Sequence, residues 1–315
     1  MNQRRLGNSE LQVSEIGLGC NNFGFVKALD VNETRRIVHR AFDCGINFLD
    51  TSDSYGHSEE FLGHVLGSHR SRVVVATKFG SQLDTEGKKK GASQRYIFSA
   101  VEASLSRLKT DWIDLYQLHR PDPDTPIEET LRALTTLVQQ GKVRCIGCSN
   151  LSSEQLLEAH ETAERLGPKQ FVTSQDEYSL LVRDIEAELL PAIEKFGMSE
   201  LPYFPLASGL LTGKYKRQEE HPADSRLAQK PALGQRYATP DNWDKVEKLS
   251  AFAGQQGHTL LELAFSWLLS HKAVGSVIAG ATKPEQVEAN ARAGNWKLSP
   301  DELTEIDRIT KPDAS

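Results

Sequence analysis

The chain has 315 residues, of which 38% are apolar and 25% are charged, and its net charge is −6. This composition is typical of a globular protein and lacks the positive excess that a dedicated nucleic-acid-binding protein usually carries. No run approaches the roughly 18 continuous apolar residues of a membrane-spanning helix, and no apolar signal core follows the N-terminus. We therefore expect a cytoplasmic protein that binds neither nucleic acid nor membrane.

The chain opens with a predicted β-hairpin at residues 4–13, because the turn signal Gly7-Asn8-Ser9 separates two short runs. Short apolar runs then alternate with amphipathic ones. The apolar runs predict strands at Glu15–Gly19, Ile46–Asp50, Val73–Lys78, Ile113–His119, Val143–Ser149, Phe171–Gln175, Leu201–Leu206 and Ser276–Ala279. The clearest predicted helices between them are Asn32–Cys44, Ser93–Lys109 and Pro126–Gln140.

This alternation of strands and helices indicates a parallel sheet and the α/β class. A doubly wound sheet is the alternative, and its dinucleotide site needs G-x-G-x-x-G after an early strand. The nearest match, residues 17–22, lacks the last glycine. We therefore predict a single domain over residues 1–315, a (β/α)8 barrel with the hairpin preceding it and covering its bottom. The long polar connection 213–241 is interrupted by three prolines, which is typical of a functional lid.

Two cysteines, Cys145 and Cys148, have the C-x-x-C spacing of redox and zinc motifs. They fall in a predicted strand, where residues three apart point to opposite faces. We therefore expect them neither to pair nor to share a metal. No H-E-x-x-H motif is present, and we predict no metal site.

Three apolar predicted strands end on ionisable residues, namely Asp50, Lys78 and His119, and Tyr55 follows in the first loop. Taken singly, each has a simple structural explanation, such as a helix cap or the first solvated residue after a strand. Together they favour a site, because barrel enzymes place their active sites at the C-terminal ends of the strands. A strand as apolar as Val73–Ala76 should not end on a buried charge without a partner, and Asp50 is the natural partner of Lys78.

These four residue types suit acid–base chemistry on a carbonyl group. Tyrosine is a weak acid with a pKa of about 10, and a nearby ammonium lowers that pKa. A carboxylate keeps the lysine charged and fixed, and a histidine can orient a carbonyl oxygen. The set therefore predicts a carbonyl that accepts a hydride while Tyr55 supplies the proton.

Seven segments, in this order, resemble the aldo-keto reductase superfamily over nearly the whole chain. The resemblance is closest to the branch with bacterial aldo-keto reductases and potassium-channel β subunits. The segments are 45–56 (GINFLDTSDSYG), 76–78 (ATK), 114–122 (DLYQLHRPD), 141–150 (GKVRCIGCSN), 175–178 (QDEY), 205–215 (PLASGLLTGKY) and 280–286 (GATKPEQ).

The resemblance implies a catalytic tetrad of Asp50, Tyr55, Lys78 and His119, and a nicotinamide cofactor extended across the barrel mouth. It assigns to that cofactor, from the nicotinamide to the adenosine end, the residues Ser149, Asn150, Gln175, Tyr203, Leu206, Ser208, Leu210, Lys214, Arg226, Gly280, Thr282, Gln286 and Asn290. The chain departs from the family at Phe204, where a serine is frequent, and at Ala289, where a glutamate is frequent.

The resemblance further implies NADPH as the cofactor, with NAD less favoured, because Arg226 and Lys283 can partner a 2′-phosphate. The predicted function is the NADPH-dependent reduction of an aldehyde or ketone to an alcohol. The alternative is a cofactor-sensing regulatory or binding module with little turnover, as the channel β subunits suggest. The expected partner is a small-molecule carbonyl compound, with Phe23 and Phe79 as candidate pocket walls, although Phe23 could equally be a core residue. The sequence leaves the substrate and the oligomeric state open.

Overall fold

The computed structural model describes residues 1–26, 29–87, 89–167, 169–220, 222 and 225–311. Eight parallel strands form one sheet in the order β10-β3-β4-β5-β6-β7-β8-β9. They are β3 (Ile16–Gly19), β4 (Phe48–Asp50), β5 (Val74–Phe79), β6 (Ile113–Leu118), β7 (Val143–Ser149), β8 (Thr173–Gln175), β9 (Ser199–Glu200) and β10 (Val277–Gly280). Backbone hydrogen bonds from Glu200 to Ala273 and from Gly275 to Glu200, both 2.8 Å, close the ring between β9 and β10. The predicted (β/α)8 barrel is confirmed.

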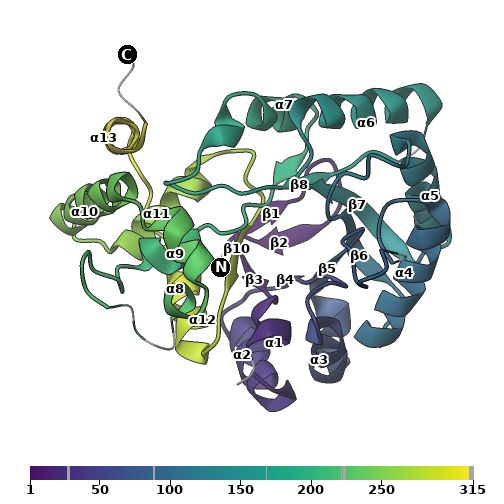
Figure 1. Ribbon diagram of the computed structural model, residues 1–315, viewed down its shortest axis with the longest axis horizontal. Coiled ribbons are helices and arrows are strands. Elements are labelled where there is room, and N and C mark those ends of the chain that lie inside the picture. Colours follow the sequence, from purple (N-terminus) through teal and green to yellow (C-terminus); the bar gives the residue numbers. More distant parts are fainter. Residues whose placement is uncertain (27–28, 88, 168, 221, 223–224, 312–315) are drawn as a thin grey trace.

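Helices surround the sheet on its outer side (Figure 1). They are α1 (Asn22–Phe25), α2 (Val31–Asp43), α3 (Ser58–Val65), α4 (Gln94–Leu108), α5 (Ile127–Gln139), α6 (Ser153–Leu166), α7 (Leu189–Lys195), α8 (Arg226–Gln229), α9 (Pro231–Tyr237), α10 (Pro240–Gln255), α11 (Leu260–Ser270), α12 (Pro284–Ala293) and α13 (Pro300–Thr310). Short 3-10 helices are η1 (Gly67–Arg72), η2 (Asp184–Glu186) and η3 (Ala207–Thr212). Of the helices in the described ranges, none is long and apolar enough to span a bilayer.

Local sequence signals account for the helix boundaries. In α6, Ser152 and Gln155 form a reciprocal capping box, and Gly167 ends the helix in the left-handed region at φ 73°. In α2, the Asp30 side chain accepts hydrogen bonds from the backbone N–H groups of Asn32 and Glu33. The apolar face of α2 then lies against the sheet, which is the reason its helical periodicity could be read from the sequence.

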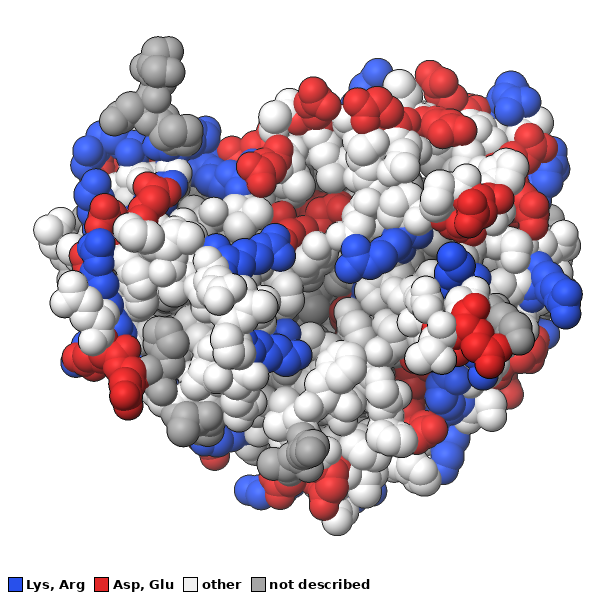
Figure 2. Space-filling model, in the orientation of Figure 1, with Lys and Arg blue, Asp and Glu red and all other residues white. Residues whose placement is uncertain are grey.

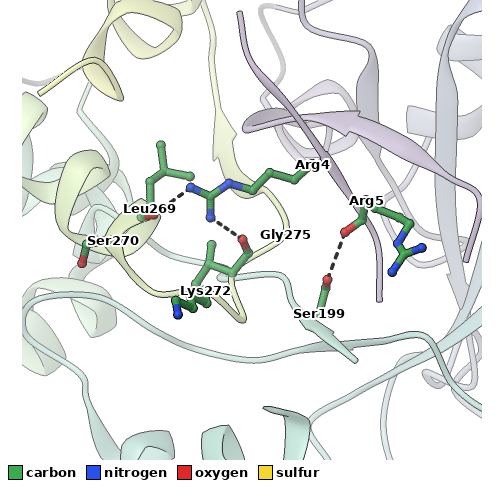
Figure 3. Close-up of a pocket in the computed structure, with 8 residues that line it drawn as sticks. Arg4, Arg5, Ser199, Leu269, Ser270, Lys272 and Gly275 are labelled. Carbon is green, nitrogen blue, oxygen red and sulfur yellow. Dashed lines mark hydrogen bonds between the residues drawn. The ribbon is translucent and has the colours of Figure 1, made fainter. Parts of the chain in front are cut away.

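An antiparallel hairpin, β1 (Gln3–Arg5) and β2 (Gln12–Ser14), covers the N-terminal end of the barrel, as predicted. Its side chains Leu6, Leu11 and Val13 pack into the barrel interior. The interior residues of the same cluster are Phe48, Val74, Ala76, Leu115, Leu201 and Ile278. Arg4 of the hairpin donates hydrogen bonds to the backbone oxygens of Leu269 and Val274, at 2.7 and 2.8 Å. Figure 3 shows Arg4 directed toward Leu269. The cavity in that view lies beside the hairpin and is lined by none of the four ionisable residues singled out above.

Side chains on each strand alternate between the barrel interior and the helix layer. Cys145 packs against the interior cluster and Cys148 lies in the outer core. Both are free thiols, as expected from their positions on one strand.

Two predictions about the C-terminal half are wrong. The segment Leu201–Leu206 is not a strand, because Pro202 and Pro205 lack backbone N–H donors and Phe204 adopts φ +50°. The paired strand is β9, and only an isolated bridge between Tyr203 and Glu177 follows it. The connection 213–241 is not entirely a loop, since it contains α8 and α9. Residues 221, 223 and 224 of that connection lie outside the described residues.

Candidate active site

Polar residues gather at the C-terminal end of the barrel interior. Asp50 is the last residue of β4 and points to the same face as Phe48, two residues earlier. Lys78 stands in the same relation to Ala76 on β5, and His119 directly follows β6. Apolar layers therefore fill the lower barrel, and a charged layer sits above them. Figure 2 shows a hollow near the centre of the visible face, with lysine and arginine side chains at its rim.

Lys78 and Asp50 form a buried ion pair, as the sequence predicted. The Lys78 Nζ atom lies 2.7 and 2.9 Å from the two Asp50 carboxylate oxygens and 2.8 Å from the backbone oxygen of Thr51. Burial lowers the pKa of Lys78, but the charge of Asp50 offsets this and the pKa ends above its ordinary value. Lys78 is therefore an ammonium at neutral pH.

Tyr55 lies beside this pair, with the Lys78 Nζ atom 5.1 Å from the centre of its ring. Burial raises the pKa of Tyr55, and Lys78 lowers it by less, so the net direction is upward. The lowering expected from the sequence is present, but burial outweighs it. The phenol therefore keeps its proton at neutral pH, which is the form that a proton donor needs.

His119 completes the group, and its ring lies edge-on to Tyr55 with 5.8 Å between centroids. Burial lowers the pKa of His119 to about 3, with contributions from the charges of Lys78 and Arg120. The imidazole is therefore neutral at physiological pH. Its Nδ1 atom lies 3.1 Å from the Ser52 hydroxyl oxygen. All four predicted tetrad residues are thus brought together.

The residues assigned to the nicotinamide also meet at strand ends. The Ser149 hydroxyl donates to the backbone oxygen of Gln175 at 2.6 Å, and the Asn150 amide donates to the Ser149 hydroxyl at 2.8 Å. The Tyr203 hydroxyl donates to Asn150 Oδ1 at 2.8 Å. Asn150 has φ +61°, and its backbone N–H donates to Asp176. This network fixes the Asn150 side chain beside His119, whose backbone oxygen also accepts from the Asn150 amide at 3.0 Å.

The segment assigned to the diphosphate has an unusual backbone. Ala207 and Ser208 lie in the left-handed region at φ 44° and 58°, followed by Gly209 at φ 96°. The backbone N–H groups of Ala207 and Gly209 donate to the backbone oxygens of Phe204 and Leu206, both at 2.8 Å, and so hold the turn in this shape. The buried Ser208 hydroxyl has no hydrogen-bond partner among the described residues. Leu206 precedes this turn and buried Leu210 lies within it.

Arg226 adds a cation to the same region. Its guanidinium carbon lies 4.9 Å from the centre of the Phe204 ring, and Tyr237 and Tyr55 are among the groups that act on its pKa. Burial lowers the pKa of Arg226, and within the described residues no carboxylate forms an ion pair with it. Phe204, the departure from the family pattern, thus provides a surface for Arg226. Lys214 lies across the neighbouring Tyr215 ring, with 4.9 Å from Nζ to its centre. A partly buried, unpaired guanidinium fits an anionic group such as a cofactor phosphate.

The residues assigned to the adenosine end lie at β10 and α12. Gly280 is the exposed last residue of β10, and Thr282 follows it. The Gln286 side-chain oxygen accepts hydrogen bonds from the Thr282 backbone N–H at 2.7 Å and from its hydroxyl at 3.2 Å. Asn290 is buried on α12. These contacts hold the polar groups of the two elements together.

Sequence reasoning missed several residues around the site. Phe23 and Phe79, the candidate walls, are buried in the core. The exposed aromatic ring beside the tetrad is Phe25, 6.0 Å from Tyr55 between centroids. Phe25 stands two residues after Phe23 in the sequence, so it could have been considered as a pocket wall together with Phe23. Ser52 also contacts His119. It lies in the segment 45–56 that resembles the family, but the sequence alone did not indicate this contact.

The fold and the site define a barrel protein with an acid–base group at the C-terminal ends of its strands. The Aldo/keto reductase family model matches residues 15–311, so the chain belongs to this family. Family membership supports an oxidoreductase role.

Relatives cover nearly the whole chain. A "Probable voltage-gated potassium channel subunit beta" of Oryza sativa subsp. japonica is 37% identical, over 99% of this chain and 97% of that protein. The L-glyceraldehyde 3-phosphate reductase of Escherichia coli is 33% identical, over 98% and 92% respectively. An uncharacterized oxidoreductase of Bacillus subtilis is 35% identical, over 99% and 98%.

Proposed function

We propose that this protein is an NADPH-dependent oxidoreductase that reduces an aldehyde or ketone to an alcohol. The observation that carries the proposal is the buried Lys78–Asp50 pair beside a protonated Tyr55 and a neutral His119. In this proposal residues 1–315 act as one barrel domain in the cytoplasm, with a small-molecule carbonyl compound as partner.

Each tetrad residue has a separate task in this reaction. Tyr55 donates the proton to the carbonyl oxygen, and the ammonium of Lys78 stabilises the phenolate that remains. Asp50 keeps Lys78 charged and fixed. His119 orients the carbonyl oxygen with its ring nitrogen. NADPH, when bound, supplies the hydride that reduces the carbonyl carbon.

The fit of the cofactor rests on the unpartnered groups along the barrel mouth. Ser149, Asn150 and Gln175 would hold the carboxamide, and the Tyr203 ring would stack on the nicotinamide. Within the described residues the Ser208 hydroxyl has no hydrogen-bond partner and Arg226 has no ion pair, and both suit the phosphates. The remaining proposed contacts are Leu206, Leu210, Lys214, Gly280, Thr282, Gln286 and Asn290. The preference for NADPH over NADH rests on Arg226 and Lys283, because a 2′-phosphate needs a cationic partner.

Absorbance at 340 nm with a panel of aldehydes and ketones tests this proposal, with NADPH and NADH compared side by side. Turnover with NADPH, and slower turnover with NADH, would support it. The 37% identity to a probable channel β subunit favours a second candidate, a cofactor-sensing module. Tight NADPH binding without turnover on any carbonyl would favour that module and contradict the reductase.

A further inference from the structure

A continuous line of polar atoms leads from His119 to a buried carboxyl group. The His119 Nδ1 atom lies 3.1 Å from the Ser52 hydroxyl oxygen. The same oxygen lies 3.2 Å from Asp53 Oδ1, to which it donates a hydrogen bond. Ser54 is a weaker contact of the ring, since its hydroxyl oxygen is 3.5 Å from Nδ1. Asp53 is not a tetrad residue, but these contacts connect it through Ser52 to His119, which is one.

The surroundings of Asp53 allow its charge to change near neutral pH. Its side chain is buried, and its Oδ2 atom has no hydrogen-bond partner in the described chain. Burial raises the pKa of Asp53 to about 7, and the charge of Glu59 adds to the effect. The titratable and charged groups that face it are Glu59 on α3, Tyr96 and Arg107 on α4, Tyr116 on β6, and His119 through Ser52.

The Ser52 hydroxyl has one hydrogen to donate, and three acceptors lie within reach of it: Asp53 Oδ1, His119 Nδ1 and the Ser54 hydroxyl oxygen at 2.9 Å. The Ser54 hydroxyl has a hydrogen of its own and can donate to Ser52, which leaves the Ser52 hydrogen to Asp53 or His119. An ionised Asp53 is the stronger acceptor, because a hydrogen bond to a charged group is the stronger one. Ser52 then accepts from His119, which must carry its proton on Nδ1. When Asp53 is protonated, the Ser52 hydrogen is free to turn to Nδ1, and the imidazole proton belongs on Nε2. His119 is neutral in both states, so only the position of its proton differs.

We propose that Asp53 is a positioning residue that sets, through Ser52, which ring nitrogen of His119 carries the proton. In the switch, one solvent proton binds at Nε2, the Nδ1 proton passes to the Ser52 oxygen, and the Ser52 proton passes to Asp53 Oδ1. No bond between heavy atoms forms or breaks.

The consequence for catalysis rests on the proposed reductase function. An Nε2–H group donates to a carbonyl oxygen and holds it for proton transfer from Tyr55. A bare Nε2 cannot donate, so this orientation is lost in the other state. Asp53 therefore couples the rate of reduction to pH.

Nitrogen NMR of the full chain labelled with ¹⁵N-histidine tests the switch without any turnover. The His119 signals are assigned by their loss in His119→Asn. In the wild type we expect Nδ1–H to give way to Nε2–H as the pH falls, with a midpoint near 7. In Asp53→Asn and in Ser52→Ala the tautomer should stay constant over the same range. Ser54→Ala should retain the switch, because it removes the contacts of Ser54 with Ser52 and His119 but leaves the Asp53–Ser52–His119 line intact.

A wild-type tautomer that is independent of pH, or an unchanged switch in Asp53→Asn, would overturn the proposal. The kinetic counterpart is kcat/KM for reduction of 4-nitrobenzaldehyde. We expect it to fall by roughly tenfold between pH 6 and pH 9 in the wild type and to be flat in Asp53→Asn. Glu60→Gln, which removes an exposed carboxylate of α3, is the matched control and should keep the wild-type profile. If no carbonyl is turned over, the proposed function fails, and the NMR result still decides the role of Asp53.

Discussion

Tyr203 donates a hydrogen bond of 2.8 Å to Asn150 and so joins the segment after β9 to the end of β7. Asn150 is held on its other side by Asp176, which accepts from its backbone N–H at 3.0 Å. The two proposed nicotinamide contacts are therefore fixed by one another and by buried neighbours. Such mutual support reduces the ordering that a ligand must impose when it binds.

Tyr203→Phe keeps the ring and removes this hydrogen bond. We expect the Kd for NADPH to rise about three- to tenfold, since a hydrogen bond of this kind contributes about 0.5–1.5 kcal/mol. Fluorescence titration measures the change. An unchanged Kd would show that Asn150 needs no help from Tyr203 to bind the cofactor.

Disruption of the buried ion pair should strongly destabilise the fold. Asp50→Asn leaves Lys78 as an unpaired buried charge, and we expect a loss of about 3–5 kcal/mol in the free energy of unfolding. Glu128→Gln is the matched control, because it removes the acid of the exposed pair with Arg132 and should cost about 0–1 kcal/mol. Urea unfolding compares the two. Equal losses would contradict the burial argument.

Much of the fold could be predicted from the sequence, because each helix buries one apolar face against the sheet and this face recurs at helical spacing in the sequence. The strand Val143–Ser149 was predicted at both ends, since its apolar face and the preceding Gly141 mark it clearly. The tetrad was predictable for a related reason. Asp50, Lys78 and His119 end apolar strands, and parallel strands bring such ends to one face.

The parts of the fold and the site that could not be predicted depend on contacts between segments that are far apart in the sequence. Leu201–Leu206 has the apolar composition of a strand, yet its two prolines and the left-handed Phe204 prevent pairing. The helix α9 begins at a proline, and Tyr237 and Arg236 near its end bond to Glu177, sixty and fifty-nine residues away in sequence. The balance of burial against Lys78 in the pKa of Tyr55 also requires the packed site.

The pKa of Asp176 predicts a pH dependence of stability. Burial raises this pKa from 3.8 to about 6. The folded protein therefore binds the proton more tightly than the unfolded chain, and this contribution to stability is lost as the pH rises from about 4 to about 6. Asp176→Asn should reduce the slope in urea unfolding measured across that range, and the part that remains belongs to other buried carboxyls with a raised pKa, such as Asp53 and Glu200. The same slope in the wild type and in the variant would exclude Asp176 as its source.

Arg226 should contribute directly to cofactor affinity. We expect Arg226→Ala to raise the Kd for NADPH by roughly tenfold or more, because charged hydrogen bonds contribute about 1.5–3 kcal/mol. Arg217→Ala is the control, since that arginine belongs to the same connection but is paired with Asp244. Similar affinities for the two variants would count against Arg226 as a phosphate ligand.

Tyr55→Phe tests most directly whether Tyr55 donates the proton in carbonyl reduction. We would measure its NADPH oxidation with the best carbonyl substrate and its Kd for NADPH, beside Tyr178→Phe, a buried tyrosine outside the tetrad. The predicted result is a loss of roughly a hundredfold or more in turnover, with an almost unchanged Kd, in Tyr55→Phe alone. Wild-type turnover in Tyr55→Phe would show that Tyr55 is not the proton donor.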